Sequence, residues 1–170
     1  MSILVNDESN ISLEIQLING ENVDIDFSRS NYQNWIPFDL NMNINGESIN
    51  YAESVPKTFS VGELQYLIDG LKRKVTEKRH SDELKDFVYV NTENLFELKI
   101  YDTGETDLLY VETWFNMGTL TNGDVYGFSK GFKFIVTIES IISFLSTLES
   151  QFDSIVKTAY DKYSIYAKLG

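Results

Sequence analysis

The chain has 170 residues, about the length of one domain, and 42% of them are hydrophobic, which is enough to fill a sizeable core. It has no cysteine and a single histidine, which excludes disulfides, thiol catalysis and a transition-metal site of the usual composition. Its net charge of −12 argues against binding to nucleic acid or to an anionic membrane, because both require Lys and Arg to neutralise phosphate.

The N-terminal residues carry neither the basic region nor the long apolar core of a signal peptide. No apolar run in the sequence is long enough to span a bilayer. We therefore expect a cytoplasmic protein with one domain that covers residues 1–170.

The first third of the chain has the pattern of β-hairpins. The dipeptides Asn19-Gly20 and Asn45-Gly46 tolerate the positive φ of a type I′ turn, and each follows a segment of alternating apolar residues. A period of two is typical of a strand with one buried face. The alternating residues are Leu13, Ile15 and Leu17 before the first turn, Val23, Ile25 and Phe27 after it, and Phe38, Leu40, Met42 and Ile44 before the second.

A helix is predicted over residues 60–79. Ser60 and Glu63 have the spacing of a capping box, in which each side chain bonds the backbone N–H of the other, and Phe59 and Leu64 have that of a hydrophobic staple. The apolar residues then recur at helical spacing, at Leu64, Leu67, Ile68, Leu71 and Val75.

More hairpins and a second helix follow. Asp102-Thr103-Gly104 and Asn122-Gly123 are turn signals between further strand-like segments near residues 98–100, 109–115 and 132–136. An apolar stripe predicts a helix over residues 138–158. We expect an α+β fold, with an antiparallel, hairpin-rich sheet of roughly six to eight strands and two amphipathic helices packed on it.

No catalytic constellation is visible in the sequence. The only histidine, His80, lies in a charged stretch at the end of the first predicted helix, and the chain has no phosphate-binding loop or nucleophile motif. Its 26 acids always offer pairs of carboxylates, but no pair stands out by its spacing, and Asp102, Glu105 and Asp107 lack the spaced loop of an EF-hand calcium site. We expect no enzyme, no catalytic residue, no metal ligand and no cofactor.

The acids are concentrated in two blocks. Residues 1–55 hold nine acids and one base, and residues 91–129 hold seven acids and one base. Both blocks are rich in strands, so helices on one side of the sheet would leave an acidic face exposed. Tyr and Trp beside Asp and Glu are typical of a protein-binding surface, although tryptophan is more often a packing residue. The candidate partner-binding residues are Asp24, Asp26, Asp39, Glu105, Asp107, Glu112 and Trp114.

One family shows a similar layout over roughly residues 30–150. The pattern comprises the early strand of residues 34–44, the helix start at residues 59–64, acidic strands, and the segment of residues 132–134 that leads into residues 138–145. In this pattern the sequence resembles the WapI-type immunity proteins of bacterial contact-dependent toxin systems. The resemblance implies a small cytoplasmic antidote, without catalytic residues, that binds and blocks the toxic C-terminal domain of a large secreted protein.

A basic toxin domain, for example a nuclease with a phosphate-binding cleft, would fit the acidic surface. Two other functions stay open on the sequence. One is a small-molecule or lipid binding module, in which a curved sheet and the C-terminal helix enclose an aromatic-lined cavity. The other is an enzyme that uses a pair of carboxylates.

Overall fold

The computed structural model describes residues 1–51, 54–80, 85–121, 123 and 127–169, with side chains up to residue 164. These residues form two antiparallel sheets and long helices, so the predicted α+β class with antiparallel hairpins is confirmed. In the first sheet the strands lie in chain order: β1 (Ser2–Val5), β2 (Ile11–Leu17), β3 (Trp35–Ile44) and β4 (Glu47–Asn50), with β5 (Thr58–Ser60) paired to β3. The second sheet has the order β6 (Phe87–Val90), β7 (Phe96–Asp102), β8 (Leu108–Asn116) and β9 (Ser129–Thr137).

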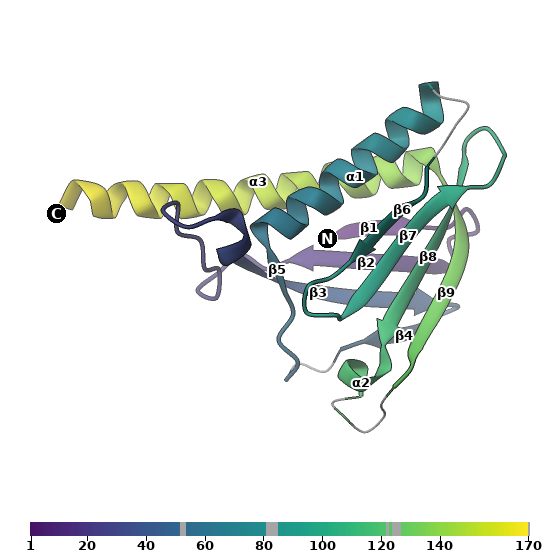
Figure 1. Ribbon diagram of the computed structural model, residues 1–170, viewed down its shortest axis with the longest axis horizontal. Coiled ribbons are helices and arrows are strands. Elements are labelled where there is room, and N and C mark those ends of the chain that lie inside the picture. The colour runs from purple at the N-terminus through teal and green to yellow at the C-terminus, as the bar shows by residue number, and fades with distance from the viewer. Residues whose placement is uncertain (52–53, 81–84, 122, 124–126, 170) are drawn as a thin grey trace.

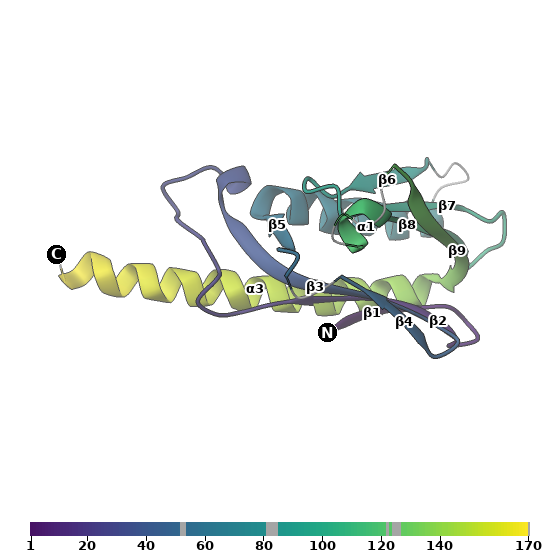
Figure 2. The ribbon, with the colours of Figure 1, turned by 90° about the horizontal axis from the view of Figure 1, so that it is seen from below.

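The helices are a 3-10 turn at Asn31–Gln33, α1 (Val61–His80), the single turn α2 (Met117–Leu120) and α3 (Ile138–Leu169). The two sheets face each other, and α1 and α3 lie on the side where β1 and β6 are found (Figure 1). Seen from below, α3 runs beside the first sheet and continues well beyond it (Figure 2). Strands were expected to form one sheet, and the structure divides them into two that share one interior.

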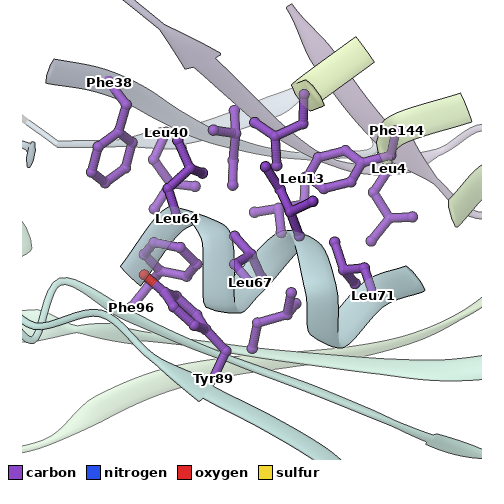
Figure 3. Packing of buried hydrophobic residues seen from close by; sticks show 14 of the residues in the cluster. Leu4, Leu13, Phe38, Leu40, Leu64, Leu67, Leu71, Tyr89, Phe96 and Phe144 are labelled. Atoms are coloured by element: carbon purple, nitrogen blue, oxygen red, sulfur yellow. The ribbon is translucent and has the colours of Figure 1, made fainter. Parts of the chain in front are cut away.

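The core fills the space between the sheets. Leu64, Leu67 and Leu71 of α1 have no exposed surface and point into this space (Figure 3). Leu64 lies near Phe38 from β3 and Phe96 from β7. Burying each of these side chains contributes on the order of 2 kcal/mol to folding. The helical spacing of the leucines therefore reflects a stripe that both sheets cover.

The start of α1 is the capping box that the sequence predicts. The backbone N–H of Ser60 donates to Glu63 Oε2 at 3.1 Å, and the N–H of Glu63 donates to Ser60 Oγ at 3.1 Å. These two bonds satisfy N–H groups that have no partner within the helix. The helix then runs to His80, one residue beyond the predicted end.

Helix α3 protects the edge of the first sheet. Ser140 Oγ accepts from the N–H of Val5 at 3.1 Å and donates to its carbonyl at 2.8 Å, so it pairs the outer side of β1. Where β2 extends past the first residue of β1, Gln151 Oε1 accepts from the N–H of Leu17 at 2.9 Å. Both side chains thus replace a neighbouring strand.

The predicted strand around Val23, Ile25 and Phe27 is wrong. Residues 18–34 form a loop that pairs only through an isolated bridge between Asp24 and Trp35, and Gly20 lacks the positive φ of a hairpin turn. Val23 and Ile25 are instead half-buried against the core and line a hollow together with Ile155 of α3, and the ring of Phe27 contacts Tyr160 of the same helix. The alternating pattern is satisfied by burial against a helix, which periodicity alone does not distinguish from burial in a sheet.

The other turns agree with the sequence where they are described. Asn45 and Gly46 have φ values of 51° and 87° and join β3 to β4, as expected for a type I′ turn. Gly104, with φ of 83°, lies in the hairpin between β7 and β8. Asn122 lies outside the described residues, so the turn predicted there stays a prediction.

Candidate protein-binding surface

Asp24 and Asp26 lie in the loop of residues 18–34 and stabilise it. The guanidinium of Arg29 bonds both carboxylate oxygens of Asp24, and its Nε lies 3.8 Å from Asp26 Oδ2. The bond from Arg29 lowers the pKa of Asp24, and bonds from the hydroxyl and N–H of Ser28 lower the pKa of Asp26. Both carboxylates are exposed, but they are already engaged in holding the loop.

Asp39 lies on the outer face of the first sheet, which is polar. Its carboxylate is 3.4 Å from the ammonium of Lys57. On the neighbouring strands, Glu14 accepts from Asn41 at 3.0 Å and from Asn43 at 2.7 Å. Side-chain amides and carboxylates saturate one another across this face, as expected of a solvated surface.

Glu105 and Asp107 lie in the β7–β8 hairpin and are exposed. The hairpin is anchored at both ends, because Lys78 of α1 pairs with Asp102 and the carbonyl of Asp107 accepts from Ile138 at 2.9 Å. The bond from Lys78 holds the pKa of Asp102 below its ordinary value. The exposed carboxylates of Glu105 and Asp107 therefore lie on a hairpin whose two ends are held in place.

Glu112 and Trp114 lie on the outer face of the second sheet, and the structure brings them together. The strands β6–β9 point alternate side chains away from the core, and we call this surface the outer β6–β9 face. Register places Trp114 between Glu97 and Gly131, and Glu112 between Lys99 and Lys133. The face consists of Val88, Val90, Glu97, Lys99, Tyr101, Tyr110, Glu112, Trp114, Gly131, Lys133 and Ile135.

A hydrogen-bond network fixes the aromatic rings of this face. The indole N–H of Trp114 donates to Glu112 Oε1, and the hydroxyl of Tyr101 donates to Glu112 Oε2 at 3.1 Å. These two donors, the indole first, hold the pKa of Glu112 below its ordinary value, with the ammonium of Lys99 3.8 Å away. Trp114 stays 36% exposed although its polar atom is satisfied.

Glycine and lysine complete the arrangement. A Cβ at Gly131 would lie 2.5 Å from Trp114 Cε3, so the indole rests flat on the glycine backbone. The ammonium of Lys133 lies 4.0 Å from the ring centre of Tyr110 and 4.9 Å from that of Tyr101, within the range of cation–π attraction. The face is thus rigid, aromatic and close to neutral.

A hollow of about 640 Å³ opens beside this face. One wall is formed by β8 and β9, and the other by the turn between β1 and β2. The lining residues are Asn6, Asp7, Glu8 and Ile11 on one side, and Leu108, Tyr110, Lys133, Phe134 and Ile135 on the other. Asp7 and Glu8 are exposed, so the side facing β9 is acidic.

The described residues hold no group of three or more His, Cys, Asp or Glu side chains that could bind a metal ion. In the part of the chain covered by the structure, no helix has the length and apolar character needed to cross a membrane. His80 is exposed at the end of α1. A ligand-binding module would need a cavity between the sheets. Figure 3 shows buried hydrophobic side chains from both sheets and from α1 in this space.

Sequence reasoning missed Tyr101, Tyr110, Gly131 and Lys133 as members of this surface. The signal was present, because Tyr110, Glu112 and Trp114 alternate with buried residues and so share one side of β8. Register with β7 and β9, which no motif encodes, decides which residues of the neighbouring strands join them.

A search of curated proteins found no match to the chain. The family described as immunity protein WapI-like matches residues 3–155, which include both sheets, α1 and the first half of α3. The predicted resemblance is thereby confirmed. The match is longer than the stretch of roughly residues 30–150 on which the resemblance was based. The chain belongs to the WapI-like family of immunity proteins.

Proposed function

We propose that this protein is an antidote that binds a cognate toxin domain directly and blocks it, without catalysis or a cofactor of its own. Membership of an immunity protein family supports the role. The observation that carries the mode of action is the outer β6–β9 face, where Trp114 is exposed, Tyr110 is half-buried, and both rings are already held in place.

Such a face suits tight binding for a physical reason. Interfaces derive most of their energy from a few residues, among which Trp and Tyr are enriched. Ordering flexible side chains opposes association, and rings fixed beforehand by Glu112 and Lys133 avoid much of that loss. The face therefore offers anchors that need no rearrangement.

The charges around the face indicate what the partner carries. Lys99 and Lys133 balance Glu97 and Glu112 within it, with Lys99 2.8 Å from Glu97. Exposed acids lie at its margin, in the hairpin at Glu105 and Asp107 and in the β1–β2 turn. We propose a basic toxin domain, for example a nuclease whose phosphate-binding cleft this surface covers in the cytoplasm.

The test uses, as the candidate toxin domain, the small C-terminal domain of a large secreted protein from a neighbouring gene. Affinity is measured by calorimetry on the purified proteins, and protection is measured by cell survival on co-expression. Trp114→Ala and Tyr110→Ala should each weaken binding at least tenfold, about 1.4 kcal/mol or more. Tyr160→Ala, which removes a ring that is 59% exposed in the C-terminal half of α3, serves as the matched control.

Two results would contradict the proposal. If no stable complex formed and survival did not depend on the protein, neutralisation by direct binding would be wrong. If Tyr160→Ala weakened binding while Trp114→Ala did not, the contact surface would lie on the C-terminal half of α3. Melting temperatures of the three variants, compared with wild type, show that each is folded.

A further inference from the structure

The edges of the two sheets differ in how they are protected. Helix α3 runs along β1, and α1 packs against β6. On the remaining sides, β4 is four residues long, whereas β9 is nine. Among the residues that the structure describes, no hydrogen bond is made by the backbone of Lys130–Val136 on the side away from β8.

The alternation of hydrogen bonds between β8 and β9 shows which backbone N–H and C=O groups of β9 point away from β8. The N–H of Met117 donates to the carbonyl of Phe128 at 3.1 Å, and the N–H of Ile138 donates to that of Asp107 at 2.9 Å. In an antiparallel ladder such bonded pairs alternate with unbonded ones. The N–H and C=O groups of Gly131, Lys133 and Ile135 therefore point away from β8.

The hollow of about 640 Å³ lies beside this edge. It is lined by Phe134 and Ile135 of β9, and Asp7 and Glu8 belong to its opposite wall. A segment that entered it could pair with the free backbone groups and place a basic side chain next to the two carboxylates. Its neighbouring side chains would reach the outer β6–β9 face, because Lys133 and Ile135 belong to both surfaces.

We propose that the toxin domain supplies an extended segment that adds to β9 as a fifth strand of the second sheet, with a Lys or Arg of that segment between Asp7 and Glu8. Strand addition to an exposed sheet edge is a general mode of recognition, in which main-chain bonds give affinity and side chains give specificity. The proposal rests on the proposed function, since it names the contact by which the toxin is held.

A second copy of this chain fits the edge less well. Antiparallel pairing of two β9 strands centred on Lys133 would place the Lys133 side chains of the two copies directly opposite each other. Like charges across a strand pair are destabilising, and lysine on an edge strand is a common means of preventing self-pairing. A basic segment instead finds carboxylates in the hollow, which agrees with the net charge of −12.

Amide hydrogen exchange of the wild-type protein, read residue by residue by NMR, tests the proposal directly. In the free protein the amides of Phe132 and Phe134, bonded to β8, should exchange slowly, and those of Gly131, Lys133 and Ile135 should exchange fast. With the toxin domain bound, the exchange of these three amides should slow at least tenfold. A complex that left them unprotected would overturn strand addition alone, while the absence of any complex would overturn both proposals.

Two pairs of variants give an independent reading. Ile135→Pro removes an outward N–H without removing a bond to β8, and should weaken toxin binding at least tenfold, whereas Ile135→Ala keeps the N–H and should weaken it less than threefold. Asp7→Asn with Glu8→Gln should weaken binding, whereas Glu21→Gln with Glu93→Gln, the same change of charge in other exposed loops, should not. Equal effects within either pair would contradict the assignment of the edge or of the acidic wall. Circular dichroism and melting temperature show whether each variant is folded.

Discussion

Glu63 has a larger role than the helix cap that its spacing predicts. Its Oε1 accepts from the hydroxyl of Tyr89 at 2.6 Å, from the side chain of Asn91 at 2.7 Å and from the N–H of Thr92 at 2.7 Å. Burial, together with the neighbouring carboxylate, raises the pKa of Tyr89. One buried carboxylate thus joins the start of α1 to the end of β6.

Replacing Glu63 should therefore lower the free energy of unfolding. In Glu63→Gln the amide would turn a donor towards the N–H of Ser60 or towards the Oε1 partners, and an unpaired buried donor costs about 1–3 kcal/mol. Urea unfolding should show this loss. Glu97→Gln, which removes a partly exposed carboxylate 2.8 Å from Lys99, is the control and should change stability by less than about 1 kcal/mol. Equal losses in both variants would show that the network around Glu63 adds nothing.

A helix, rather than a further strand, covers one edge of the first sheet. The outer edge of the first sheet is completed by side chains of α3 rather than by another strand, with two bonds between Ser140 and Val5 of β1 and one between Gln151 and Leu17 of β2. The two segments are separated by most of the chain. These backbone groups can therefore find their partners only once α3 has docked, so the first sheet depends on the last helix of the chain.

Ser140→Ala should destabilise the protein although alanine favours helix. Loss of the two bonds to Val5 is worth about 1–2 kcal/mol, against about 0.5 kcal/mol gained from helix propensity. Ser143→Ala, at an exposed position of the same helix, gains the same propensity and loses no bond to β1, so the difference between the variants isolates the edge contact. Thermal unfolding and the exchange rate of the Val5 amide measure it. The contact would be without effect if both variants were equally stable.

The two halves of the chain are interlocked. Helix α1 follows the first sheet but packs on β6 of the second, and α3 follows the second sheet but packs on β1 of the first. Salt bridges from Lys72 to Glu149 and from Arg79 to Glu139 join the two helices. The single domain expected over residues 1–170 stays a prediction, and this arrangement supports it.

Net charge should act on the rate of association rather than on a single contact. Replacing Asp24, Asp26, Glu105 and Asp107 together by the neutral amides should slow association with the toxin domain several-fold at low salt. The difference from wild type should shrink towards 0.5 M salt, where exposed charges are screened. Stopped-flow measurements over a range of ionic strength test this. A wild-type rate at every salt concentration would show that these acids do not steer the partner.

Local structure and the class of the protein can be read from the order of the residues alone. Helix α1 begins at its capping box, and the β3–β4 turn forms at Asn45-Gly46, as their residues predict. The pattern of strands and helices also indicates the family. These features depend on neighbouring residues, whose spacing is written in the chain. The strand expected at residues 23–27 failed because alternation reports burial without naming the element that provides it.

The positions of the surfaces depend on how distant segments of the chain pack together. Whether the strands form one sheet or two, and which of them end as a free edge, depends on contacts between segments far apart in the chain. The predicted partner-binding residues accordingly lie at four separate places: a loop bound by Arg29, a polar sheet face, a hairpin, and the outer β6–β9 face with Glu112 and Trp114. The hollow beside β9 exists because the β1–β2 turn of the first sheet lies across from it, and no local pattern encodes that meeting.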